Sequence, residues 1–292
     1  MTANVQLLIL GLTLGGVYAL MASGLTLVFG VMHIVNLAHA VFIFLGAYLT
    51  YFAFTEAGID PFLSLLVTMP IMFGLGVLLY RLLFPRLEGS HRFVQATVLL
   101  TFSLALTIEG TLAFLFTGIF RTTTPSYATD AIIAGPYYVP AAQLYASLVS
   151  LLLLGLLGMF LSFTRTGYAI RATMQNRTAA QIVGVNVRRT SGIAFGVGLA
   201  LAGASGALVS FLFTFFPSGH WQWIALLLSL IVLGGLGSLR GALVGAFALA
   251  VVSVFVADWF GSTWQPMTFF LALFLILLVR PQGLFGQPLE AR

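Results

Sequence analysis

The sequence predicts an all-α protein that crosses a membrane about eight or nine times. Of its 292 residues, 60% are hydrophobic and only 7% are charged, whereas soluble domains are about a quarter charged. The apolar residues also gather in stretches close to the roughly 20 residues that a helix needs to cross a bilayer. So little charge cannot cover the surface of a soluble protein of this size.

Nine apolar stretches are candidate spans. They lie near residues 5–30, 34–54, 62–84, 93–119, 141–163, 191–213, 222–239, 242–257 and 266–280. Some of them are candidates for broken or re-entrant helices, so eight full spans are also compatible with the pattern. The N-terminus, MTANVQ, has no basic segment of the kind that begins a cleaved signal peptide, and the first span is expected to remain in the mature protein.

The arginines predict the orientation. The longest polar run, residues 163–190, contains no acidic residue and five of the twelve basic residues: Arg165, Arg171, Arg177, Arg188 and Arg189. Loops rich in Arg and Lys face the cytoplasm. With this loop inside, the turns that carry the other arginines, Arg292 included, also fall inside, and only Arg121 is left outside. We therefore expect the N-terminus outside and the C-terminus inside.

The same loop contains a predicted amphipathic helix. Between Tyr168 and Val183, the apolar residues Ile170, Met174 and Ile182 lie near one stripe. Gly184 follows at the position where a glycine often ends a helix. A short helix on the inner membrane face is well placed to contact a soluble partner.

Two stretches suggest an internal repeat. GVYALMASGLTL at 16–27 resembles GLALAGASGALV at 198–209, about 182 residues later, and the Ala-Ser-Gly triplet recurs at 22–24 and 204–206. A polar interruption follows each copy. The predicted topology inverts one copy relative to the other, and inverted repeats with interrupted helices are one way to build a transport pathway. The alternative is chance similarity in a chain rich in Gly, Ala and Leu.

The two interruptions supply candidate pathway residues. Asn36 and His39 are three residues apart and share a face if this segment is helical, and Ser218 and His220 lie in the second interruption. Polar side chains at membrane depth face the protein interior or a water-filled path. They either line a path for a zwitterionic solute, beside the end of a broken helix, or hydrogen-bond between helices and fix the packing.

Glu109 is the one acidic residue well inside a predicted span. It is a candidate for the same pathway, and a sharper hypothesis makes it a proton relay in a proton-coupled carrier. A relay needs partners, however, and the other acidic residues are predicted to lie in loops or at the termini.

Several functions are disfavoured by what the sequence lacks. It has no Cys and no Lys, so it has neither a cysteine metal site nor the Lys of an ordinary P-loop. If transport uses ATP, another subunit binds it. The four histidines are dispersed, and no metal set, catalytic pair or cofactor motif is present. The net charge of +5 is typical of membrane orientation and does not indicate nucleic acid.

Four stretches together resemble the H-type permease subunits of bacterial ABC importers for branched-chain amino acids. They are GLTLVFGVMHIVNLAHA at 24–40, RTGYAIRATMQNRTAAQIVGVNV at 165–187, GGLGSLRGALVGA at 234–246 and RPQGLFG at 280–286. They occur in order along nearly the whole chain. The resemblance therefore implies a single permease domain, residues 1–292, in the inner membrane.

The resemblance also implies partners and contact residues. It implies a second, different permease subunit, two cytoplasmic ATP-binding subunits and an external solute-binding protein. It makes the segment near 164–190 the loop that couples to the ATPases. The residues expected to take part are Arg165, Gly167, Arg171, Arg177, Ala179, Ala180, Gly184 and Asn186.

The sequence departs from the family pattern in places that concern the solute. Ala40 and Val41 stand where a Gly followed by a small or acidic residue is usual, and His33 replaces a commoner Arg. A urea or amide importer of the same family is therefore one alternative. A stand-alone carrier that uses Glu109 is the other.

Overall fold

The computed structural model describes residues 2–87 and 92–286, and it confirms the all-α membrane architecture. His91 and Arg292 lie outside these residues. The elements of the first half are α1 Thr2–Met32, α2 His39–Ala57, α3 Pro61–Leu83, η1 Phe84–Arg86, α4 Phe93–Phe116, η2 Ser126–Ala128, β1 Ala131–Ala134, β2 Tyr137–Pro140 and α5 Ala141–Phe163. Those that follow are α6 Arg165–Gln175, α7 Arg177–Ile182, α8 Val187–Leu212, η3 Pro217–Gly219, α9 His220–Gly234, α10 Leu239–Phe260, η4 Ser262–Trp264 and α11 Gln265–Val279.

Eight helical segments in the described chain are long and apolar enough to span a membrane. The ninth expected stretch, near 222–239, corresponds to α9, which has only 15 residues. It stops at Gly234 because Gly235 and Gly237 adopt φ values of +102° and +80°, which favour glycine and end a helix. An α-helix of that length is only about 22 Å long, shorter than the hydrocarbon core of a bilayer.

Helices α1 and α8 form the centre of the bundle. In the most apolar stretch of 18 residues, 67% of the residues of α1 and 89% of those of α8 are buried. The corresponding share for α4 is 17%. They cross at Gly24 and Gly198, where a Cβ on Gly24 would lie 2.7 Å from the carbonyl oxygen of Gly198. Because glycines let two backbones approach this closely, the crossing brings the two halves of the chain together.

The two central helices pack on the opposite half of the chain in a similar way. Gly11 and Gly15 of α1 face Val251 and Phe247 of α10. On the other half, Gly192 of α8 faces Tyr80 of α3, and Gly196 faces Val77. Each central helix thus uses two glycines, four residues apart, to pack on the third helix of the opposite half.

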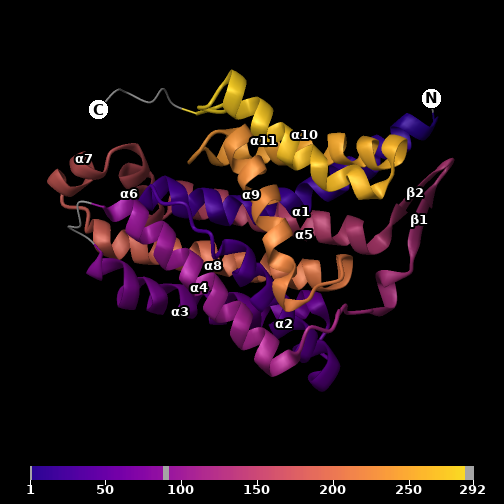
Figure 1. Ribbon diagram of the computed structural model, residues 1–292, viewed down its shortest axis with the longest axis horizontal. Helices are drawn as coiled ribbons and strands as arrows, with labels where there is room; N and C mark the ends of the chain where they lie inside the picture. Colours follow the sequence, from indigo (N-terminus) through magenta and orange to yellow (C-terminus); the bar gives the residue numbers. More distant parts are fainter. Residues whose placement is uncertain (1, 88–91, 287–292) are drawn as a thin grey trace.

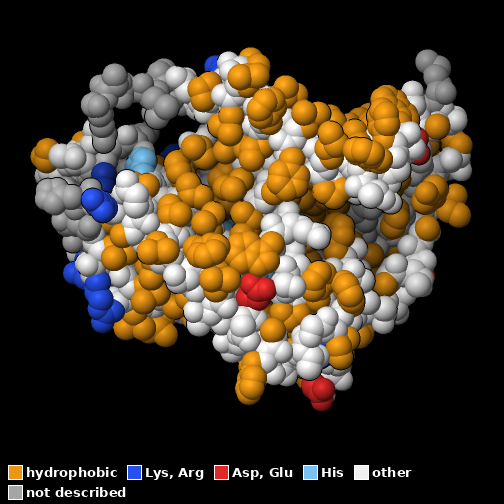
Figure 2. All heavy atoms as spheres, in the orientation of Figure 1, with side chains coloured by type: hydrophobic (Ala, Val, Ile, Leu, Met, Phe, Trp, Pro, Cys, Tyr) orange, Lys and Arg blue, Asp and Glu red, His pale blue; other side chains and the backbone are white. Residues whose placement is uncertain are grey.

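Except for Arg121, the described arginines lie at one end of the bundle, and Figure 2 shows several of them there, with apolar side chains beside them. We call this the Arg-rich end: it comprises the end of α3, the start of α4, helices α6 and α7, the start of α8, the start of α10 and the end of α11. The opposite end carries the β1–β2 hairpin and the start of α1 (Figure 1), and we call it the hairpin end.

Arg121 is the one described arginine at the hairpin end, and its contacts explain the exception. Its guanidinium lies over the rings of Tyr51 and Phe52, 5.0 and 5.5 Å from their centroids. It also donates a hydrogen bond of 3.2 Å to the carbonyl of Phe116. Its charge is therefore used in cation–π contacts that tie α2 to the end of α4.

Candidate functional site

The first interruption places the start of α2 inside the bundle. α1 ends at Met32 and α2 begins at His39, yet the His39 ring lies beside Gly24, where an added Cβ would be 3.0 Å from its Cε1 atom. Gly24 is two helical turns, or about 12 Å, before the end of α1. Residues 33–38 therefore turn back along α1 without helical structure, so α2 begins as a broken helix.

Asn36 forms a hydrogen-bonded turn just before this broken helix. Its Oδ1 accepts a hydrogen bond of 3.1 Å from the N–H of Ala38, and its carbonyl accepts one of 3.2 Å from the N–H of His39. Asn36 lies outside the helix, so the condition under which Asn36 and His39 would share a helix face is not met. The Asn side chain bonds to the neighbouring backbone and so competes with helix formation at this position. The N–H of Leu37 donates to Thr101 Oγ1 of α4 at 3.3 Å.

Buried polar atoms without partners gather at this interruption. The amide nitrogen of Asn36 and both ring nitrogens of His39 have no hydrogen-bond partner among the described residues. The backbone of Met21 lies near the His39 ring, but the geometry does not make a hydrogen bond. Since buried polar groups are normally paired, these atoms are candidates to meet a solute or water.

The second interruption has the same form. α8 ends at Leu212 and α9 begins at His220, and between them Phe215 exchanges two backbone hydrogen bonds of 2.9 Å with Arg121. His220 is fully buried. Its Nδ1 lies 3.0 Å from the carbonyl of Pro217, to which it donates, while its Nε2 has no partner among the described residues. Ser218 is exposed.

The starts of the two broken helices are neighbours. Phe44, in the second turn of α2, contacts His220 and Trp223 of α9, with ring centroids 6.3 and 6.2 Å apart. The N-terminus of a helix carries partial positive charge. Two such ends, with His39 and His220 as their first residues, can stabilise an anionic group between them.

Glu109 of α4 lies next to the start of α9. It is half-buried, and its Oε2 accepts a hydrogen bond of 2.9 Å from Trp221 Nε1. The ring of Trp221 also packs on Phe102 of α4, at 5.7 Å between centroids. A carboxylate beside aromatic rings is suited to a cation such as an ammonium group. The structure thus brings Glu109 and His220 to one region of the bundle.

The loop at the Arg-rich end contains two helices where one was expected. Asn176 has φ −156° and ψ 108°, and it both ends α6 and begins α7. Its Oδ1 accepts a hydrogen bond of 2.9 Å from the N–H of Ala179. The amphipathic pattern was therefore right for α6, but it hid an N-cap residue in its middle.

The expected coupling residues divide into exposed and structural ones. Arg165, Arg171, Ala179 and Gly184 are exposed, and Arg177 is half-buried. Gly184 has φ +88° and open space around it.

Gly167, Ala180 and Asn186 have a role in the fold. Gly167 is buried where a side chain would strike the backbone of Phe160 and Leu161, and Ala180 is also buried. Asn186 is exposed, but its Oδ1 caps α8 by accepting from the N–H of Arg189 at 2.9 Å.

Two apolar residues that follow the Ala179–Ala180 pair are uncovered. Ile182 and Val183 are 82% and 76% exposed, whereas Ile170 of α6 is fully buried. Sequence reasoning put Ile182 on the same stripe as Ile170, and the break at Asn176 separates them. Both apolar side chains are therefore uncovered at the Arg-rich end of this chain.

Among the described residues, no group of three or more His, Cys, Asp or Glu could hold a metal ion.

The model of the family described as "Branched-chain amino acid transport system / permease component" matches residues 7–279. The chain belongs to this family.

Curated relatives agree with this assignment. This permease is 28% identical to the high-affinity branched-chain amino acid transport system permease protein BraD of Pseudomonas aeruginosa, over 97% of this chain and 96% of the relative. It is 26% identical to LivH of Salmonella typhimurium, over 95% and 94%. It is 25% identical to the probable LivH of Methanocaldococcus jannaschii, over 91% and 88%. No solved structure matches it significantly.

In this permease the four stretches that carry the resemblance meet in space. Gly30, in the first, lies against Met174 of the second and Gly237 of the third. The fourth pairs with the end of α9, since Leu284 and Phe285 donate backbone hydrogen bonds of 2.9 and 3.1 Å to Leu233 and Gly234. They therefore join the broken helices to the loop at the Arg-rich end.

Proposed function

We propose that this chain is a permease subunit of an ATP-driven importer for branched-chain or related amino acids. In this proposal a second, different permease subunit completes the pathway, and two cytoplasmic subunits bind and hydrolyse the ATP. An external solute-binding protein delivers the solute. The membrane is a bacterial inner membrane, with the Arg-rich end in the cytoplasm, the N-terminus outside and the C-terminus inside.

The observation that carries the ATPase contact is the exposed pair Ile182 and Val183 at the Arg-rich end. Both lie in the 164–190 loop, away from the apolar belt, so lipid tails do not cover them. Gly184, with open space around it, lets this tip enter a groove. We infer that α7 and Gly184 form the coupling element, and that α6 transmits its movement because it packs on α1 and α8.

The proposed solute site lies between the starts of α2 and α9. An amino acid is a zwitterion, and its two charges need opposite partners. The helix starts at His39 and His220 offer positive ends for the carboxylate, and Glu109 offers a negative charge for the ammonium group. The unpaired nitrogens of Asn36, His39 and His220 supply further polar contacts.

Two alternatives differ in the solute and the energy source. A urea or amide importer of the same family needs no carboxylate for an ammonium group, so the half-buried Glu109 favours an amino acid. A stand-alone proton-coupled carrier needs a relay of titratable groups. The other described acidic residues, Glu56, Asp60, Asp130 and Asp258, sit at helix ends and loops, so a relay through Glu109 would have to pass through His220.

The test is uptake of labelled leucine and labelled urea by cells with and without the gene, each with and without ATP depletion. The proposal expects leucine uptake that requires both the gene and ATP. Uptake of urea alone that requires both the gene and ATP would support an ATP-driven importer but identify urea as its solute. Uptake that persists without ATP but stops when the proton gradient collapses would reject the importer.

A further inference from the structure

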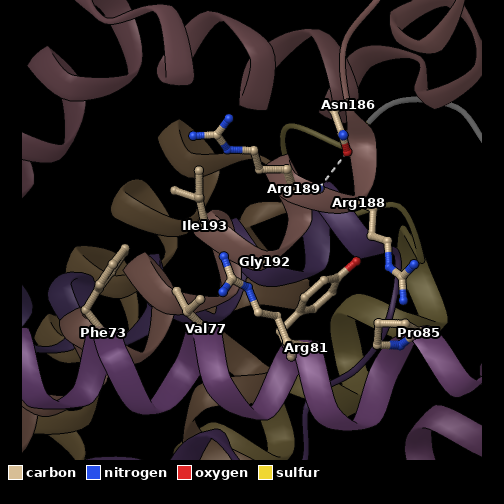
Figure 3. Close-up of a pocket in the computed structure, with 10 residues that line it drawn as sticks. Phe73, Val77, Arg81, Pro85, Asn186, Arg188, Arg189, Gly192 and Ile193 are labelled. Atoms are coloured by element: carbon tan, nitrogen blue, oxygen red, sulfur yellow. Dashed lines mark hydrogen bonds between the residues drawn. The ribbon is translucent and has the colours of Figure 1, made fainter.

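A groove between α3 and α8 lies at the Arg-rich end and is not part of the proposed solute path. Its volume is about 570 Å³, within the range of small-molecule sites. Arg81 of α3 lines it, as do Arg188 and Arg189 at the start of α8, with Arg188 directed toward Pro85 and Arg189 toward the side of Ile193 (Figure 3). The cap that Asn186 makes with the N–H of Arg189 holds the turn that carries the last two arginines.

The groove has a charged part and an apolar part. The charged part carries the three arginines, and none of the described residues that line the groove is a carboxylate. The apolar part consists of Phe73 and Val77 of α3 and Ile193 of α8. Val77 and Phe73 lie one and two turns before Arg81, so they extend from the membrane boundary toward the middle of the span.

We propose that this groove binds an anionic phospholipid. Arginines hold the phosphate through charge-assisted hydrogen bonds, and an acyl chain lies along Phe73, Val77 and Ile193. Basic pockets between membrane helices on the cytoplasmic side recognise anionic headgroups in this way. The groove opens onto an apolar surface of this chain, since Leu78 and Leu82 beside it on α3 are 53% and 47% exposed.

The apolar part argues for a lipid over an acidic segment of a partner subunit. An acidic peptide that approaches from the cytoplasm pairs with the arginines, but it leaves Phe73 and Val77 uncovered. A phospholipid satisfies both parts with one molecule. This proposal goes beyond the solute path and the ATPase contact, and it needs only the membrane orientation given above.

The experiment measures the lipid that stays bound. The full chain, purified with the subunits that accompany it, is exposed to phosphatidylcholine alone or mixed with phosphatidylglycerol, and the retained lipid is counted by native mass spectrometry. We expect retained phosphatidylglycerol, and a loss of roughly fivefold in its affinity for each arginine removed in R81Q, R188Q and R189Q. The matched control R165Q/R171Q/R240Q removes the same charge from the same end, outside the groove, and should retain the lipid.

A second pair of variants tests the apolar part. Val77→Trp fills the groove with all arginines present and should reduce retention, whereas its neighbour Leu78→Trp should not. Inorganic phosphate alone should not displace the lipid. The proposal would be overturned if R81Q/R188Q/R189Q and the control triple lost equal amounts of phosphatidylglycerol, or if Val77→Trp retained as much lipid as the unchanged protein. So would groove variants that lose an accompanying subunit while they still retain phosphatidylglycerol.

Discussion

Trp221 of α9 donates its indole N–H to Glu109 of α4 at 2.9 Å. This bond joins the start of a broken helix to a helix that is otherwise loosely packed, since only 17% of the most apolar window of α4 is buried. A carboxylate at membrane depth is costly unless it meets a partner or water. Glu109 is therefore held at the edge of the proposed path, with one oxygen bound and the rest of the group accessible.

Glu109→Gln should weaken uptake without disturbing the fold. The amide oxygen can still accept the hydrogen bond from Trp221, but the negative charge is lost. We expect the KM for leucine uptake to rise about tenfold, because a hydrogen bond to a charged group contributes about 1.5–3 kcal/mol. Glu56→Gln, which removes an exposed charge at the end of α2, is the control. An unchanged KM in Glu109→Gln would remove Glu109 from the solute site.

Ile182→Asp should separate this subunit from its ATPase partners. It places a charge in the apolar patch of α7, where burial of an isoleucine contributes about 1.5–3 kcal/mol. We expect at least a tenfold fall in co-purified ATPase with little change in the thermal stability of the permease. Ile133→Asp makes the same change at a residue that is 77% exposed in the hairpin at the opposite end. Equal ATPase recovery from both variants would contradict the contact.

Gly184→Val should uncouple ATP hydrolysis from uptake. A β-branched residue is strained at φ +88°, by about 1–2 kcal/mol, and its side chain would occupy the space around the loop tip. We expect folded protein, continued ATP hydrolysis and reduced uptake. Gly58→Val imposes similar strain at φ +66° with open space around it, at the hairpin end, so its coupling should stay normal. Normal uptake by Gly184→Val would argue against the role of the loop.

Gly24→Ala should destabilise the bundle. Its Cβ would lie 2.7 Å from the carbonyl oxygen of Gly198, and neither backbone can move without separating α1 from α8. Overpacking of this kind costs about 1–3 kcal/mol, which should appear as a lower melting temperature in detergent. Gly155→Ala in α5 meets no atom within 4 Å and should be neutral or slightly stabilising. A Gly24→Ala variant as stable as the Gly155→Ala control would mean that the crossing is looser than described.

Asn36 allows its role in the turn before α2 to be separated from a role in transport. Asn36→Ser keeps a side-chain oxygen that can accept from the N–H of Ala38 but removes the unpaired amide nitrogen. We expect near-normal stability with reduced leucine uptake. Asn36→Ala removes the hydrogen bond of the turn as well and should lose about 1 kcal/mol of stability. If Asn36→Ser transports normally, the residue serves the packing alone.

Much of the fold could be predicted because the signal is local. Apolar runs identified every long helix, and the α5 boundaries at 141 and 163 agree with the structure. Pairs of residues that are distant in the chain could not be predicted in this way. Nothing in the local pattern around Glu109 indicates Trp221, and nothing near Gly24 indicates Gly198. The loop helix was predicted as one piece because its periodicity continues through Asn176, whose cap becomes visible only in the backbone.

The sequence by itself determined that this chain is a multi-span helical membrane protein, and its motifs indicated the permease family. Hydrophobic length and charge bias are properties of each segment alone, so they need no partner. The tertiary structure decided that α2 and α9 begin within the bundle, side by side, and that Ile182 protrudes while Ile170 is buried. These features depend on the glycine crossings and on which backbone groups find hydrogen bonds, and only the packed chain sets both.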